Sequence, residues 1–283
     1  MLRKFLAIVE DTIREGLAKK TILGMLIVST VTIIIAVLLF QMDSVQKGLL
    51  SPAGEHIKNG SNQPAPGLMG LSVLEYVWMS ISMMLLVASI FVGSFVTTGF
   101  ITSLMEKGNI DLLLSKPVPR WLYIVGRYSG AVLIILVEVS YLIFGLWLVA
   151  GLSLHTWSGV FLASIPLITL SFAGVYALVT LVGILTRSSW FAMIIGLAIY
   201  VLASIVVPIA QWIDKLLNGD TGGGIVTTVA KIFHYTIPSE GMGGALNEVL
   251  LSKELHSTPL FLTTGLAMVY VAIACYAFSK KEF

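Results

Sequence analysis

The apolar positions of the chain gather into six long, nearly unbroken runs separated by polar segments. The runs are Thr21–Phe40, Val77–Leu104, Leu122–Ala150, Val160–Leu185, Trp190–Ile213 and Pro259–Phe278. Each reaches or exceeds the roughly 20 residues that an α-helix needs to cross the hydrocarbon core of a bilayer. Because the runs are continuous rather than alternating, they favour helices over barrel strands. The pattern predicts an all-α polytopic membrane protein, with six transmembrane helices in a single domain that covers residues 1–283.

The first twenty residues follow a different pattern. Their apolar side chains recur at helical spacing, and charged residues occupy most of the positions between them. The apolar set is Leu2, Phe5, Leu6, Val9, Ile13 and Leu17. Residues 1–20 are therefore expected to form an amphipathic helix that lies on the membrane surface before the first span. The pattern alone does not decide between a plain anchor and a mechanical role.

Composition and charge agree with a membrane protein. Hydrophobic residues make up 57% of the 283 residues, charged residues 11%, and the mean hydropathy is +0.95, whereas a soluble domain carries about a quarter charged residues. A net charge of +2 is too small to indicate a nucleic-acid partner. Of the seventeen Lys and Arg residues, twelve fall on the side that holds both termini and five on the other. The positive-inside rule then predicts a multi-pass protein of the cell (cytoplasmic or inner) membrane with both termini cytoplasmic.

Two external segments are expected. Residues 41–70 are polar, rich in Gly and Pro, and predicted to be irregular. Residues 214–258 contain two apolar stripes at helical spacing, Val226–Ile237 and Met242–Leu250. They predict two short helices at the outer interface, turned at Pro238-Ser239. Whether these helices close an exit path or shield the loop stays open at this point.

Common enzymatic motifs are absent from the sequence. The chain contains no Gly-Lys pair, so it has no phosphate-binding loop, and neither H-E-x-x-H nor G-x-S-x-G occurs. The four histidines match no metal-ligand spacing. We therefore expect no catalytic site and no cofactor bound by this chain.

One acidic residue, Glu138, lies near the middle of the third run. A charged side chain at that depth costs about 2.5–3.5 kcal/mol on insertion scales, so it should face protein or a water-filled cavity. Two interpretations remain. Glu138 is either a polar site on a transport path or a partner in an interhelical hydrogen bond to Ser or Tyr on a neighbouring helix.

The stretch "MEKGNIDLLLSKPVPRW", Met105–Trp121, places three leucines between two spans on the cytoplasmic side. Asn109 is a suitable N-cap, residues 110–115 can form about one and a half turns, and Pro117 ends them. Such a helix would present Ile110, Leu113 and Leu114 on one side. Exposed apolar residues at such a place indicate a partner protein or a lipid surface; the alternative is a plain turn between two spans.

The longer stretch "EKGNIDLLLSKPVPRWLYIVGRYSGA" resembles the segment after the second span of ABC-2 type permeases, the membrane subunits of ATP-binding-cassette transporters. The resemblance rests on an acidic residue and a glycine, then "LLLS-x-P", a basic residue and the start of the next span, "GRYSG", Gly126–Gly130. More loosely, it extends to the amphipathic N-terminal helix, the six spans and the long fifth external loop. The most similar subgroup is that of the small six-span permeases. Asn109 departs from the pattern, in which Thr or a similar residue is more usual.

The resemblance implies that residues 105–121 are a coupling helix that docks in a cleft of a separate ATPase. The residues implied in this contact are Glu106, Gly108, Asn109, Ile110, Asp111, Leu112, Leu113, Leu114, Ser115, Pro117 and Arg120. ATP and Mg would then be bound by the ATPase, which is expected in two copies. A second copy of this chain, or a related permease, completes the transporter, and an accessory or periplasmic protein is allowed for as a further partner. The resemblance also implies export as the direction of transport.

Two other classes of function are kept as alternatives. One is an ion-coupled carrier or channel centred on Glu138, in which transport follows an ion gradient. The other is a membrane enzyme or an assembly scaffold. A permease of the ABC type differs from both because its transport depends on ATP and on a partner ATPase.

Overall fold

The computed structural model describes residues 1–42, 58–59, 63–64, 73–102, 119–155, 157–218, 242–252 and 257–280. Six helices of twenty residues or more dominate it: α2 (Thr21–Phe40), α5 (Val73–Thr102), α7 (Arg120–Leu154), α9 (Ser164–Thr186), α10 (Ser189–Asn218) and α13 (Ser257–Lys280). The shorter helices are α1 (Leu2–Ala18), α8 (Gly159–Leu162) and α12 (Met242–Ser252). Two strands of two residues each, β1 (Lys58–Asn59) and β2 (Gln63–Pro64), pair antiparallel. The predicted all-α polytopic class is confirmed.

Five helical stretches in the described part of the chain are long and apolar enough to cross a membrane. They are Thr21–Phe40, Leu74–Ile101, Arg120–Leu154, Gly159–Thr186 and Ser257–Lys280. A shorter apolar stretch, Ser189–Leu202, opens α10. All six predicted runs therefore coincide with helices. Five of these helices have the length and composition of a membrane span, and the remaining run lies in α10, of which the first half is the shorter apolar stretch.

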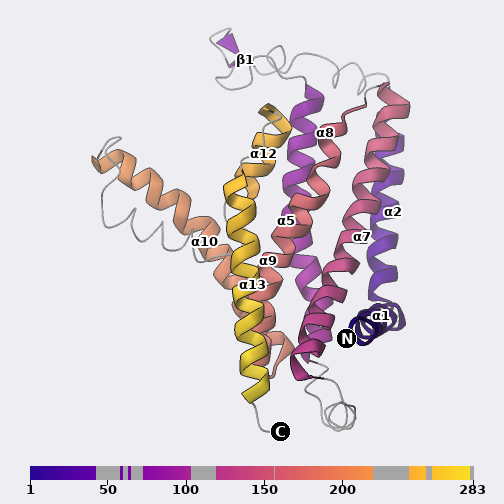
Figure 1. Ribbon diagram of the computed structural model, residues 1–283. Coiled ribbons are helices and arrows are strands. Elements are labelled where there is room, and N and C mark those ends of the chain that lie inside the picture. Colours follow the sequence, from indigo (N-terminus) through magenta and orange to yellow (C-terminus); the bar gives the residue numbers. More distant parts are fainter. Residues whose placement is uncertain are drawn as a thin grey trace.

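The long helices form a bundle with α9 at its centre (Figure 1). Helix α9 packs against α5, α7, α10 and α13, and most of its side chains are buried. Among its residues, Ile168, Phe172, Val175 and Tyr176 are fully enclosed. Helix α2 lies at the edge, where it packs mainly on α7 and leaves most of its apolar side chains exposed. A helix that is apolar all round and buried only on one side is expected where lipid is the solvent.

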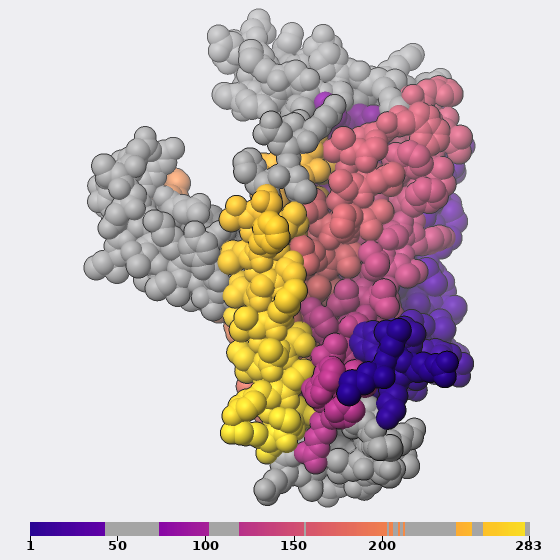
Figure 2. Space-filling view, viewed as in Figure 1, coloured from indigo at the N-terminus to yellow at the C-terminus, as the bar shows by residue number. Residues whose placement is uncertain are grey.

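Two helices depart from the common direction of the bundle. Helix α1 runs across its neighbours rather than along them, and α10 leans away from the bundle (Figure 1). Between α1 and α2 the backbone of Lys20 is left-handed, with φ 58°, so the chain turns sharply there. Figure 2 shows α1 lying over the surface of the lower part of α7. The predicted amphipathic helix in residues 1–20 is thus confirmed as α1.

The predicted boundaries differ from the observed ones in places that have a physical explanation. The predicted fourth span, 160–185, is divided at Ala163 into α8 and α9. Pro166, in the first turn of α9, lacks an amide hydrogen, and its ring would clash with the carbonyl of Leu162 in a continuous helix. Helix α7 extends four residues beyond the predicted end at Ala150 and stops at His155, whose backbone is left-handed.

One of the two predicted external helices is present as α12. It packs on α5, α8, α9 and α13 through an apolar face that includes the buried Met242, Ala245 and Leu246. The other predicted helix, at 226–237, lies outside the described residues. Whether α12 closes an exit path or only covers this end of the bundle stays a prediction without a test.

Candidate functional site at the junction of α1, α5 and α7

Most of the predicted coupling segment, residues 105–121, lies outside the described residues. This holds for all its candidate residues except Arg120: Glu106, Gly108, Asn109, Ile110, Asp111, Leu112, Leu113, Leu114, Ser115 and Pro117. Arg120 is the first residue of α7 and is half-buried. The structure does fix both flanks of the segment, because α5 ends at Thr102 and α7 begins at Arg120. These two ends lie at the same end of the bundle as α1 (Figure 1).

The two glycines of the "GRYSG" motif form the seat of α1 on α7. A Cβ atom at Gly126 would lie 2.6 Å from Cγ2 of Ile8, and one at Gly130 would lie 2.7 Å from Cβ of Thr12. Both Ile8 and Thr12 are buried. Since carbon atoms in van der Waals contact stay about 3.5–4.0 Å apart, any other residue at these two positions would force α1 away from α7.

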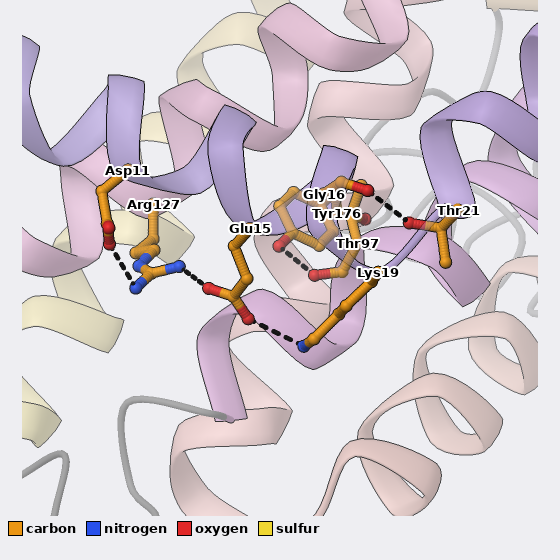
Figure 3. Close-up of polar contacts among 8 residues, drawn as sticks. All are labelled: Asp11, Glu15, Gly16, Lys19, Thr21, Thr97, Arg127 and Tyr176. Atoms are coloured by element: carbon orange, nitrogen blue, oxygen red, sulfur yellow. Dashed lines mark hydrogen bonds and ion pairs between the residues drawn. The ribbon is translucent and has the colours of Figure 1, made fainter.

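The arginine of the motif connects the same two helices by charge. Arg127 Nη2 donates to Asp11 Oδ2 at 2.8 Å, and Arg127 Nη1 donates to Glu15 Oε2 (Figure 3). The second carboxylate oxygen of Glu15 accepts a hydrogen bond of 2.7 Å from Lys19 Nζ. We call Asp11, Arg127 and Glu15 the ion triad. It fixes the rotation of α1 about its own axis, because Asp11 and Glu15 lie one turn apart on one side of the helix.

The two acidic members of the ion triad sit in different surroundings. The Glu15 side chain is 21% exposed, that of Asp11 is 66% exposed, and that of Arg127 is 11% exposed. Burial raises the pKa of the Glu15 carboxyl, but the hydrogen bond from Lys19 and the charge of Arg127 outweigh burial and hold this pKa below its usual value. The ionised form of Glu15 is therefore the one that the docked arrangement of α1 favours.

The tyrosine of the motif continues the contact into the core. The Tyr128 hydroxyl donates to the carbonyl oxygen of Ala173 at 2.8 Å, and its ring stacks on Tyr176 with centroids 5.7 Å apart. Tyr176 stacks in turn on Phe172 at 5.3 Å and donates to the carbonyl oxygen of Thr97 at 2.9 Å. This row of rings joins α7 to α9, and the last hydrogen bond joins α9 to α5.

The C-terminal end of α1 reaches α5 directly. A Cβ atom at Gly16 would lie 3.2 Å from Cζ of Phe100, and Lys19 Nζ lies 5.8 Å from the centre of the Phe100 ring. Thr21, at the start of α2, donates to the carbonyl oxygen of Gly16 at 3.2 Å. Helix α1 therefore contacts the last turn of α5 and the first turns of α7, the two helices that flank the coupling segment.

Glu138 lies away from this junction, between α7 and α2. Ser29 Oγ donates to Glu138 Oε1 at 2.5 Å, and both side chains are buried. One residue further along α2 and three residues further along α7, the hydroxyls of Thr30 and Tyr141 are 3.0 Å apart. This geometry is the interhelical hydrogen bond to serine that one of the two interpretations of Glu138 expected. A role of Glu138 on a transport path is not tested by it.

Sequence reasoning singled out the motif but not its partners. Asp11 and Glu15 look like ordinary residues of a solvated face, and Tyr176 looks like an ordinary aromatic of an apolar run. Two features of the sequence together could have indicated the contact. Asp11 and Glu15 are four residues apart, and Arg127 lies between two glycines that are also four residues apart. Among the described residues, no group of three or more His, Cys, Asp or Glu side chains could hold a metal ion.

Comparison with known protein families adds a separate line of evidence. The sequence profile described as "ABC-2 family transporter protein" matches residues 23–283, which includes residues 105–121, the GRYSG motif and all the long helices except the first two residues of α2. No curated protein is significantly similar to the chain. Since the profile covers far more than half of the sequence, the chain belongs to the ABC-2 family and is a membrane permease of an ABC transporter.

Proposed function

We propose that this chain is the membrane subunit of an ABC exporter, driven by a separate ATPase that docks on residues 105–121. Permeases of this family work with ABC ATPase subunits and are not themselves catalytic. The complete transporter contains two ATPase copies, which bind ATP and Mg, and two permease chains, either two copies of this chain or this chain with a related one. Both termini lie in the cytoplasm. This agrees with the bias of Lys and Arg toward that side of the chain, and with the position of α1 and the last turn of α13 at the same end of the bundle (Figure 1).

The mechanism follows from the position of α1. Closure of the two ATPases on ATP moves the coupling segment, and with it the end of α5 and the start of α7. The Arg127 ion triad and the glycine seats make α1 move with α7, and the Tyr128–Tyr176 contact transmits the movement to α9. Tilting of these helices exposes a cavity between the two permease chains alternately to each side of the membrane.

The observation that carries this proposal is that α1 touches both flanks of the coupling segment. It contacts α5 at Phe100 and α7 at Gly126, Arg127 and Gly130. A helix needed only to anchor the chain would not have to contact both helices that connect to one loop. The arrangement supports a rigid cytoplasmic unit in which a force on residues 105–121 reaches three helices together.

The substrate class is proposed from the small number of charges in the spans. The 29 residues of the predicted third span contain two charged residues, Arg127 and Glu138. Since a path for a polar cargo needs polar groups along it, the cargo is expected to be apolar or amphipathic, such as a lipid, a drug or a peptide.

The test of the proposal is affinity purification of the tagged chain in mild detergent. The wild-type chain is expected to bring down an ATPase subunit. A triple variant with Leu112, Leu113 and Leu114 changed to Ser should release that subunit while still inserting into the membrane. The matched control changes the same three residues to Met, which keeps the surface apolar and should retain the ATPase. If the serine variant keeps its partner, the docking surface is wrongly assigned.

A further inference from the structure

Helix α5 contains a run of residues that are weak helix formers. Residues 93–99 read Gly-Ser-Phe-Val-Thr-Thr-Gly, and none of them belongs to the strong helix formers Ala, Leu, Met, Gln, Glu, Lys and Arg. The run opens with a Gly-Ser pair, which is a common site of helix kinks. It is nonetheless part of one helix, Val73–Thr102. Its helical form therefore depends on its surroundings more than on its own residues.

Three backbone carbonyl groups of this run accept hydrogen bonds from hydroxyl groups. Thr97 Oγ1 donates to the carbonyl oxygen of Gly93 at 2.7 Å, and Thr98 Oγ1 donates to that of Ser94. From α9, the Tyr176 hydroxyl donates to the carbonyl oxygen of Thr97 at 2.9 Å. Hydroxyl bonds of this kind often bend helices, and inside a membrane they satisfy backbone groups that a bend releases. These three carbonyl groups would therefore keep a partner if their helix bonds opened.

The serine of the run has an unused hydroxyl group. Ser94 is fully buried, and its Oγ atom has no hydrogen-bond partner among the described residues. A buried hydroxyl without a partner destabilises the conformation that contains it. Serine in a helix can reach the carbonyl oxygen four residues earlier, which here is that of Ile90. A bend that opens the backbone bond at Ile90 would give both groups a partner.

The surroundings of the run restrict a bend to one side. Toward α9, Gly93 lies against the fully enclosed Phe172, whose Cε2 atom would be 2.8 Å from a Cβ atom at position 93. On the other side Phe95 is 59% exposed, and its ring meets that of Trp190 edge-on with the centroids 6.0 Å apart. Trp190 is itself 65% exposed. The contact with α9 is tight, whereas the side chains around Phe95 lie at the surface and are free to move.

We propose that residues 93–99 of α5 are a hinge, at which the end of α5 that leads into the coupling segment rotates relative to the rest of the helix. Beyond the hinge, Phe100 contacts α1 at Gly16. Before the hinge, Met83 contacts α12 at Gly243. The hinge therefore separates a part that moves with α1 from a part that stays with α12. This inference rests on the proposed function, because the ATPase supplies the movement, but the hinge itself is a property of this chain.

Glycine-to-alanine substitutions that cause no clash test the hinge. Gly99→Ala is suitable because the only described atom within 4 Å of a Cβ atom there would be Lys19 Nζ, at 4.0 Å. The matched controls are Gly24→Ala on α2 and Gly265→Ala on α13, where no described atom lies within 4 Å of the added Cβ. Since Ala favours the helix over Gly, all three variants should keep the Tm of the purified protein at or above that of the wild type. Only Gly99→Ala should also oppose the bend.

The first measurement is hydrogen exchange of the isolated full-length chain in nanodiscs. Amides of residues 94–99 should exchange faster than those of residues 172–177, which lie beside them on α9, because a hinge opens locally more often than its neighbours. Gly99→Ala should slow the exchange at 94–99 by about fivefold, since Ala favours a helical position by about 1 kcal/mol over Gly. The two control variants should leave it unchanged.

The second measurement is ATP turnover of the complex with the ATPase that co-purifies with the chain. Gly99→Ala should lower turnover by about fivefold at an unchanged amount of bound ATPase, because each cycle needs the bend. Ser94→Ala adds no atom and removes the unpaired hydroxyl, so the double variant should lower turnover by about tenfold. Gly24→Ala and Gly265→Ala should turn over ATP at the wild-type rate.

Two results would overturn the inference. Exchange at residues 94–99 that is as slow as at 172–177 would show that α5 has no hinge there, with or without an ATPase. Equal turnover by Gly99→Ala and its two controls would show that the transport cycle does not bend α5 at this place. A chain that brings down no ATPase would instead contradict the proposed function, and the exchange of the isolated chain would still decide whether the hinge exists.

Discussion

Neutralising Arg127 should detach α1 from α7, and the two bonds of the ion triad should contribute unequally. Glu15 and Arg127 are both mostly buried, and a hydrogen bond between charged groups contributes about 1.5–3 kcal/mol. Because Lys19 remains as a partner of Glu15, the lower part of that range applies. Asp11 is 66% exposed, and an exposed ion pair contributes only about 0–1 kcal/mol. Arg127→Gln should therefore cost about 2 kcal/mol of docking free energy, most of it through Glu15.

The assay uses a thiol placed in the contact. Thr12 is fully buried under Gly130, so Thr12→Cys in the Cys275→Ser background reacts with a small thiol reagent only when α1 has moved away from α7. A loss of about 2 kcal/mol corresponds to about a thirtyfold faster reaction. Glu15→Gln should give most of that increase, and Asp11→Asn about a fivefold increase at most. In double-variant cycles, Arg127 should couple strongly to Glu15 and weakly to Asp11.

The reasoning would be refuted if Arg127→Gln left the reaction rate at position 12 unchanged. It would also be refuted if Asp11→Asn had the same effect as Glu15→Gln, because burial would then not decide the strength of the two bonds. Arg127→Lys is the conservative control: it keeps the charge but loses the two-pronged geometry, so its rate should fall between those of the wild type and Arg127→Gln.

Three further predictions concern the same bundle. Gly130→Leu should lower the Tm of the purified protein through an overpacking cost of about 1–3 kcal/mol, whereas Gly265→Leu, at a site on α13 with nothing within 4 Å, should not. Glu138→Gln should keep ATP-dependent transport, since Gln can still accept the hydrogen bond from Ser29; complete loss of transport in this variant would favour the ion-coupled carrier. The docked state favours ionised Glu15, so docking of α1 should be complete above the usual carboxyl pKa of 4.5 and weaken as the pH falls through the lowered pKa. Glu15→Gln should remove this pH dependence, which the reaction at position 12, corrected for free-thiol reactivity, would show.

Much of the fold follows from the sequence because lipid imposes a strong constraint. A continuous apolar run of twenty or more residues has few other ways to satisfy its backbone than a helix, and over the described residues all six predicted runs are helical apart from the break at Ala163. The break at Ala163 was also encoded, by Pro166, but the unbroken hydropathy of residues 160–185 concealed it. Hydropathy measures how apolar a stretch is and does not record a missing amide hydrogen.

The junction of α1 and α7 was only half predictable. The GRYSG motif drew attention through its resemblance to ABC-2 permeases, but the sequence did not show that its glycines receive Ile8 and Thr12. The apolar stripe predicted from the sequence coincides only in part with the contact face of α1: Leu2, Leu6 and Leu17 are exposed, and only Val9 of the set is buried. Close helix contacts in membranes use small residues instead, so the face with Thr12 and Gly16 was overlooked.

The most direct test of the central claim, that energy enters from a partner ATPase through residues 105–121, is hydrogen exchange of the purified permease–ATPase complex. The account predicts that trapping the complex with ATP changes exchange in the last turns of α5 and the first turns of α7, and that the serine variant of Leu112, Leu113 and Leu114 abolishes this change. The chain without its ATPase should show no response to the nucleotide. A complex that binds ATP without any change at these two helix ends, or an isolated chain that responds to ATP as the complex does, would contradict the account.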